Sequence, residues 1–261
     1  MALNKPLSAS GFEADITALR NTYEALHFQS DVLRTLYQAH TAGSFLPDFI
    51  VEDVRKAAFV KSLNREIIET LILVGIIGAF QKFVKVLVSD VLNTLRVKNA
   101  SFTTLDETFR NRYLAAAAAT FRFKPDGTVK GVRINFATIQ DSLAKCLVDD
   151  ADYTLEGEAI TSEMGNPTPN TVDGIFDKIG MNSPFDTAYG DYLLKNGWSG
   201  DKTSGQAIRS SQATIVTNVQ RRNDAVHGLE KVVFYQGEIA DLCGQFESIG
   251  MGLFESVNSR V

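Results

Sequence analysis

A proline-free apolar tract constrains the fold of this chain more than any other feature. From Ile50 to Leu95 the sequence contains no proline and only two glycines, Gly75 and Gly78. Its centre, LILVGIIGAF (residues 71–80), is apolar on every side, whereas its flanks are amphipathic. Because a helix that is apolar all round is buried, we expect a long helix in the middle of a helical bundle. The two glycines would let a neighbouring helix approach it closely.

The same tract bears on membrane association and cellular compartment. The LILVGIIGAF run is bounded by Glu69 and Gln81, so it is shorter than the roughly 18 apolar residues that a membrane-spanning helix needs. The N-terminus, MALNKPLSASG, has no apolar core of a signal peptide. Cys146 and Cys243 lie far apart and form no CxxC pair, which argues against a disulfide framework or a structural zinc site. We therefore expect a cytoplasmic protein with no membrane partner.

Composition indicates the broad class of protein to which the chain belongs. The chain has 261 residues, 44% hydrophobic and 22% charged, which is typical of a soluble globular protein with a sizeable core. Its net charge of −5 excludes a strongly basic surface. Contact with a nucleic acid would therefore depend on a local cationic patch.

Helical signals dominate the first half of the chain. Ser10 and Glu13 have the spacing of a capping box, and apolar residues then recur at three- and four-residue steps, which predicts a helix over residues 10–41. Pro47 is suited to open the second, central helix. Thr104 and Glu107 form a second capping-box pattern before a strongly helix-forming alanine run.

After the alanine run the helical pattern is interrupted by turn and strand signals. Pro125-Asp126-Gly127 predicts a turn, with a short β-hairpin around it, before helix resumes at 137–148. Residues 149–163 contain six acids and no lysine or arginine. Without a defined ligand spacing, these acids indicate a solvated acidic loop or insertion, which we extend over 149–170.

The last third of the chain again reads as helical. A short helix capped by Asn170 or Thr171 should end at Gly180, and a polar, aromatic loop region should follow over 182–205. The two final helices are predicted at 205–226 and 230–258. The pattern as a whole predicts one mainly all-α domain over 1–261.

The stretch QRRNDAVHG, residues 220–228, carries the candidate chemistry. His227 follows Arg222 by five residues, and Gly228 should end the helix there. On a straight helix the two side chains lie about 140° apart, so they converge only if the helix ends between them or frays. Histidine can move a proton near neutral pH, and arginine grips phosphate oxygens in a planar fork. Such a pair suits attack by an RNA 2′-hydroxyl on its own phosphate, with no metal ion or other cofactor.

Neighbouring residues have candidate roles as well. Asn223 could orient the phosphate or the histidine, and Asp224 could hold the imidazole tautomer or be a plain surface carboxylate. Arg221 could add a phosphate contact. A simpler interpretation of Arg222 and His227 is that they stabilise the end of a helix. Outside the motif, Trp198 could stack a base or anchor its loop, and His27 and His40 are surface or packing residues of the first helix.

The motif resembles the R-x4–6-H signature of HEPN domains. Residues 216–228, VTNVQRRNDAVHG, are similar to the form seen in the RiboL-PSP-HEPN group, including the polar residue after the arginine. Residues 76–92 are similar to the long first core helix of that group, and residues 166–181 to its short helix before the motif. The resemblance covers about 60–258 and leaves an N-terminal helical extension, 1–45, outside it.

The resemblance implies an α-helical bundle that forms a homodimer with two R-x4–6-H motifs facing one cleft. Many HEPN proteins are metal-independent endoribonucleases in toxin–antitoxin or anti-phage systems, so an antitoxin or defence-system protein is an implied partner besides RNA. Arg222, Asn223 and His227 would be the catalytic residues and Arg221 an RNA-binding residue. Two alternatives stay open: a catalytically silent HEPN dimer that binds a protein or nucleotide, and a helical adaptor that docks through its N-terminal helix.

Overall fold

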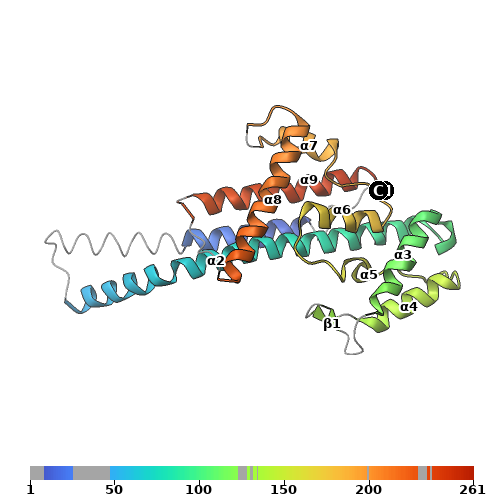
Figure 1. Ribbon diagram of the computed structural model, residues 1–261, viewed down its shortest axis with the longest axis horizontal. Helices are drawn as coiled ribbons and strands as arrows, with labels where there is room; N and C mark the ends of the chain where they lie inside the picture. Colours follow the sequence, from blue (N-terminus) through green and yellow to red (C-terminus); the bar gives the residue numbers. More distant parts are fainter. Residues whose placement is uncertain are drawn as a thin grey trace.

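The protein is described by a computed structural model, which confirms the all-α fold (Figure 1). It describes residues 9–25, 48–122, 128–129, 132–133, 135–198, 200–228, 234–235 and 237–261, with the backbone alone for 48–67, 128–129 and 132–133. The helices are residues 9–25, α2 (Asp48–Lys98), α3 (Glu107–Thr120), α4 (Phe136–Leu147), α5 (Gly157–Thr161), α6 (Pro169–Lys178), α7 (Thr187–Lys195), α8 (Ser204–Val226) and α9 (Glu238–Asn258), with a 3-10 turn, η1 (Phe102–Thr104).

Helix α2 is the axis of the bundle, as the apolar tract predicted. Helices α5, α8 and α9 pack against α2, and of these α8 crosses over it (Figure 1). Phe80 of α2 is fully buried and lies edge-on to Phe246 of α9, with ring centroids 5.5 Å apart. A Cβ added at Gly75 would lie 2.8 Å from Leu19 Cδ2, so the close approach predicted there is confirmed, whereas nothing lies within 4 Å of one added at Gly78.

The N-terminal helix, residues 9–25, belongs to this core. Phe12 and Ile16 are buried, and the Phe12 ring lies 4.8 Å from that of Phe83 on α2. Because the helix already includes residue 9, Ser10 lies inside it and is not the predicted N-cap. The rest of the predicted 10–41 helix, with His27 and His40, lies outside the described residues.

One described helical segment, Ile68–Lys98, is long and apolar enough by length and composition to cross a membrane. From the sequence, only the shorter and most apolar run, residues 71–80, was compared with the length of a membrane span. Half of the segment's most apolar window is buried against the rest of the chain. A core helix of a soluble protein has the same properties, and the packing of α2 is that of a core helix.

Helix α3 begins later than the second capping-box pattern suggested. Its N-cap is Asp106, whose Oδ1 accepts the Phe109 N–H at 3.0 Å, while Thr104 lies in the preceding 3-10 turn. The short hairpin is present as β1 (Thr128–Val129) and β2 (Val132–Arg133), paired antiparallel. Val129 pairs with Val132, and the predicted turn, Pro125-Asp126-Gly127, lies outside the described residues.

The acidic stretch 149–163 is not the solvated loop we predicted. Its apolar side chains Tyr153, Leu155 and Ile160 are buried, and α5 packs against α2. The reason lies in its alternation, because three of its acids are exposed and three are half-buried, while the apolar residues between them face the core. The backbone N–H of Glu156 donates to the buried Tyr113 hydroxyl at 2.7 Å, which fixes the stretch to α3.

Helices α6 and α7 follow. Helix α6 is capped by Thr168, before the predicted caps Asn170 and Thr171, and ends at Lys178. The predicted C-terminal glycine, Gly180, follows with a φ of +69°. Arg112 of α3 donates to Asp177 Oδ1 at 2.7 Å and ties α3 to α6. Helix α7 occupies part of the region predicted as loop, because Asp186 provides an N-cap that the sequence reading missed.

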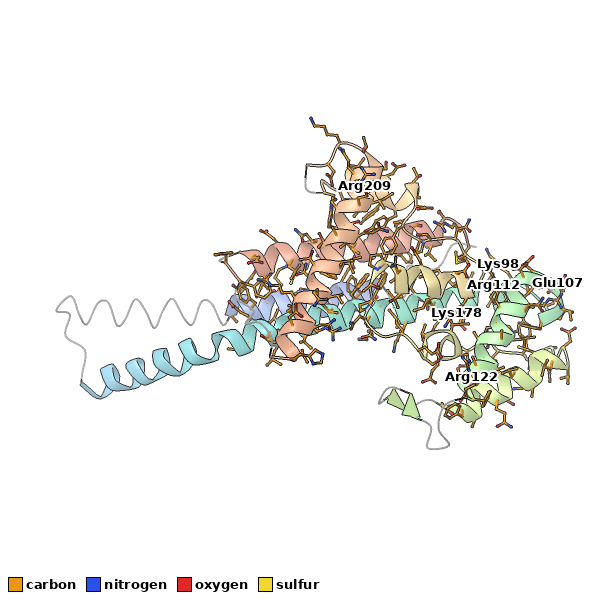
Figure 2. The ribbon with its side chains drawn as sticks, in the orientation of Figure 1. Lys98, Glu107, Arg112, Arg122, Lys178 and Arg209 are labelled. Atoms are coloured by element: carbon orange, nitrogen blue, oxygen red, sulfur yellow. The ribbon has the colours of Figure 1, made fainter. Side chains whose placement is uncertain are left out.

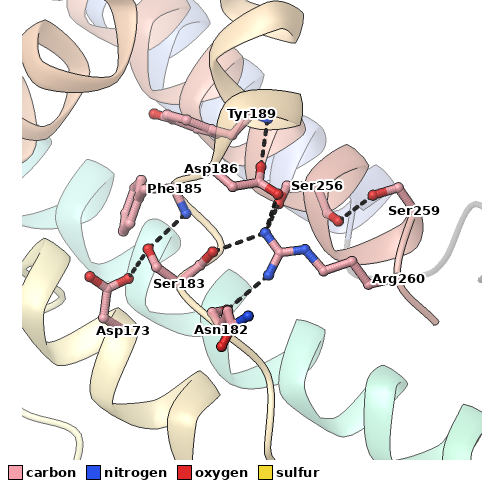
Figure 3. A network of polar contacts seen from close by, with 9 residues as sticks. All are labelled: Asp173, Asn182, Ser183, Phe185, Asp186, Tyr189, Ser256, Ser259 and Arg260. Carbon is pink, nitrogen blue, oxygen red and sulfur yellow. Dashed lines mark hydrogen bonds and ion pairs between the residues drawn. The ribbon is translucent and has the colours of Figure 1, made fainter. Parts of the chain in front are cut away.

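Helix α9 begins at Glu238, eight residues after its predicted start. At its other end, the Arg260 guanidinium donates to the carbonyl oxygens of Asn182 and Ser183, each at 2.9 Å, and pairs with Asp186 (Figure 3). These contacts fix the end of the chain against the connection between α6 and α7. The buried core is one large cluster that runs from residue 9 to residue 257, with a smaller cluster where α3, α4 and α5 meet.

Candidate functional site

The candidate motif lies at the C-terminal end of α8. Thr203 caps the start of this helix by accepting the Gln206 N–H, and one face, which includes Ile215 and Val219, is buried. His227 is the C-cap, and Gly228 follows with a φ of +69°, a conformation that glycine adopts without steric cost. The predicted helix end at Gly228 is therefore confirmed.

His227 is exposed, and its backbone continues the helical hydrogen bonding. Its N–H donates to the Asn223 carbonyl at 3.0 Å, which is an i to i−4 bond. The helical hydrogen bonding therefore continues through the C-cap His227, and the angular offset of about 140° persists. Val226, just before the histidine, is 56% exposed.

Arg222 lies on a different, half-buried side of α8. Its Nη2 donates to Asn166 Oδ1 at 2.7 Å, in the connection between α5 and α6. Its Nε is buried without a hydrogen-bond partner, and no carboxylate among the described residues pairs with it. Burial lowers the pKa of the Arg222 guanidinium from its ordinary value, because desolvation penalises the charged form. A bound anion would offset that penalty.

The described contacts do not join Arg222 to His227 within one chain. Asn223 lies half-buried between them and contributes its carbonyl to the His227 N–H. The Asp224 carboxylate accepts from Gln220 Nε2 at 2.7 Å, one helical turn away. That contact favours the surface-carboxylate interpretation of Asp224 over a role in holding the imidazole.

Arg221 has structural partners. Its Nη1 donates to Glu238 Oε1 at 2.7 Å, and its guanidinium lies 4.1 Å from the centroid of the Phe234 ring. The Phe234 N–H in turn donates to the buried Glu69 carboxylate of α2 at 3.1 Å. Arg221 thus fastens the start of α9 and the segment before it to α8, and this pairing argues against its predicted role as a free phosphate contact.

Asn166 is the residue near the motif that the sequence reading missed. It is 56 positions from Arg222, and only its place before Pro167, at the start of the segment with HEPN resemblance, could have singled it out. Trp198, by contrast, is 7% exposed and donates its Nε1–H to Ser210 Oγ at 2.8 Å, which supports the loop-anchoring interpretation.

Among the described residues, the structure shows neither a group arranged to bind a metal ion nor a reactive thiol. No group of three histidine, cysteine or acidic side chains there is arranged to hold a metal ion. Cys146 and Cys243 are both buried and unpaired, and burial raises the pKa of the Cys146 thiol to about 11, which keeps it protonated and unreactive at neutral pH.

Comparison with known proteins gives no further assignment. No family model, no curated protein and no solved structure matches this chain.

Proposed function

We propose that the protein is a metal-independent endoribonuclease of the HEPN type. The observation that carries the proposal is Arg222, a half-buried cation without a carboxylate partner among the described residues, five positions before an exposed histidine. A guanidinium in this state suits a phosphate group, and an accessible imidazole suits proton transfer. Together they provide the groups needed when a 2′-hydroxyl attacks its neighbouring phosphate and the 5′-oxygen leaves.

The active site in this proposal needs two copies of the chain. On α8 the Arg222 and His227 side chains point in directions about 140° apart. A two-fold axis beside the exposed end of α8 would bring His227 of one copy toward the Arg222 side of the other. The resemblance to HEPN dimers supports this arrangement, and the same resemblance supports a role in toxin–antitoxin or anti-phage defence with a partner protein that restrains the activity.

The first prediction concerns oligomeric state. At micromolar concentration the protein should be a homodimer of about twice 28.6 kDa, since a closed two-fold assembly is needed to complete the site. Light scattering coupled to size-exclusion chromatography measures this mass. A single-chain mass across the concentration range used for activity assays would contradict the shared site.

The second prediction concerns the reaction. RNA cleavage should persist in EDTA and leave a 2′,3′-cyclic phosphate, because the nucleophile is the substrate's own 2′-hydroxyl. Mixed RNA, the same RNA with 2′-O-methyl groups, and DNA of the same sequence provide the comparison, with products resolved on a denaturing gel. Only unmodified RNA should be cleaved. Activity lost in EDTA and restored by magnesium would contradict the mechanism.

A catalytically silent HEPN module is the second candidate, and one contact favours it. Arg222 already has an intramolecular partner, Asn166, so its role could be to hold the connection before α6 against α8. In that case wild-type protein would leave RNA intact, and Arg222→Ala would lower the melting temperature.

A further inference from the structure

We infer that Asn166 is the positioning residue for the Arg222 guanidinium, an inference that rests on the proposed function. The 2.7 Å bond from Arg222 Nη2 to Asn166 Oδ1 is the only side-chain hydrogen bond of Arg222 among the described residues. Since arginine only donates hydrogen bonds, the acceptor must be the amide oxygen. This bond sets the direction of the planar fork.

Asn166 is itself held in place. Pro167 follows it, and a following proline restricts the backbone of the residue before it to extended conformations. The Thr168 N–H donates to the Asn166 carbonyl at 2.8 Å. Gln81, on the central helix α2, donates through Nε2 to the carbonyls of Met164 and Gly165, at 3.2 and 2.9 Å. The amide of Asn166 is therefore presented from a connection that is anchored to the central helix α2.

The acceptor that Arg222 contacts is an amide oxygen of Asn166 and not a carboxylate, and this difference affects the charge of the guanidinium. An amide oxygen orients a guanidinium without neutralising its charge, whereas a carboxylate does both. The neighbouring Arg221 shows the second case, because Glu238 pairs with it. In Arg222, Nη2 is engaged and Nε is buried without a partner, while Nη1 has no hydrogen bond to another described residue. An oriented fork that keeps its full charge fits a phosphate oxygen.

The test separates orientation from charge with two substitutions and a matched control. Asn166→Ala removes the orienting bond but leaves the cation. Asn166→Asp keeps an acceptor and neutralises the cation. Asn170→Asp makes the same chemical change at an exposed position four residues away on α6. Circular dichroism melting should show that all three variants fold like the wild type.

Two measurements are made on each variant. The first is RNA cleavage, separated into kcat and KM. The second is the affinity for uncleavable 2′-O-methyl RNA across a salt series, measured by fluorescence anisotropy, which reports phosphate contacts without needing activity.

We expect Asn166→Ala to lower kcat roughly 10- to 100-fold with little change in KM, because a misoriented group loses its catalytic geometry. Its salt dependence of binding should match the wild type. Asn166→Asp should lower kcat at least as much and reduce the slope of log affinity against log salt by about 0.7, the loss of one phosphate contact on a single strand. In an Arg222→Ala background, Asn166→Ala should cause no further loss of rate, because its effect acts through the arginine.

The two proposals can fail separately. If wild-type protein cleaves RNA and both Asn166 variants behave like Asn170→Asp, the positioning role is overturned and the ribonuclease stands. If wild-type protein binds but does not cleave RNA, the ribonuclease is overturned, and the salt slopes still decide the role of Asn166. An activity loss that follows a lower melting temperature, or additive losses in the double variant, would identify Asn166 as a structural contact and overturn the inference.

Discussion

Replacing His227 with alanine should abolish RNA cleavage while leaving the fold intact. The side chain is exposed at the C-cap of α8, so its removal creates no cavity, and Gly228 still ends the helix. Loss of one general acid–base group slows a reaction by about 10²- to 10⁴-fold. Single-turnover cleavage of labelled RNA, with protein in excess, can measure a loss of that size.

Two controls distinguish proton transfer from helix capping. His227→Asn retains a polar side chain suited to a helix end but cannot carry a proton near neutral pH, so it should be as inactive as His227→Ala. Gln220→Ala changes another exposed side chain near the same end of α8 and should leave the rate unchanged. If His227→Asn cleaves RNA at the wild-type rate, His227 is a helix cap and not a catalytic residue. Cells in which the wild-type protein slows growth should recover when His227→Ala replaces it.

Arg222→Ala should have the second large effect, a loss in kcat of about 10²- to 10³-fold, which is typical when a preorganised donor to a developing negative charge is removed. Arg222→Lys should not restore the rate, because an ammonium lacks the planar fork that Asn166 orients. The measurement is the same single-turnover assay, with steady-state kcat and KM for both variants.

The matched control for Arg222 is Arg209→Ala. Arg209 belongs to the same helix but is exposed near its opposite end (Figure 2). Its replacement should change neither kcat nor melting temperature. Because Arg222 is half-buried, its variants also need melting curves: a stability loss in Arg222→Ala with no cleavage by the wild type would favour the silent module over the ribonuclease.

Local sequence signals predicted most of the helices because their causes are local. The apolar tract of α2, the positive-φ glycines after α6 and α8, and the boundaries of α8 all follow from periodicity and from the conformational freedom of glycine. Caps were less predictable, since several nearby polar residues could cap the same helix. Asp106 and Thr168 do so, whereas the sequence patterns favoured Thr104 and either Asn170 or Thr171.

The acidic stretch, residues 149–163, shows a different limit of prediction from sequence. Six acids indicated a solvated loop, but Tyr153 and Leu155 are buried, and the Tyr153 ring lies against Phe102 of η1 and under Arg96 of α2. Burial of the apolar side chains decided the position of this stretch, and the carboxylates had only to remain at the surface. A count of charges does not contain that information.

For the candidate site, too, one part follows from the sequence and another only from the tertiary structure. By itself the sequence singled out the candidate residues of the proposed site, Arg222 and His227, and determined where their helix ends, because residue type and a terminal glycine are local properties. Only the tertiary structure decided their surroundings. It paired Arg221 with Glu238, gave Arg222 an amide partner 56 residues away, and left His227 exposed. Partners so distant in sequence meet only after the bundle has packed around α2, so no local pattern could specify which arginine keeps its charge available.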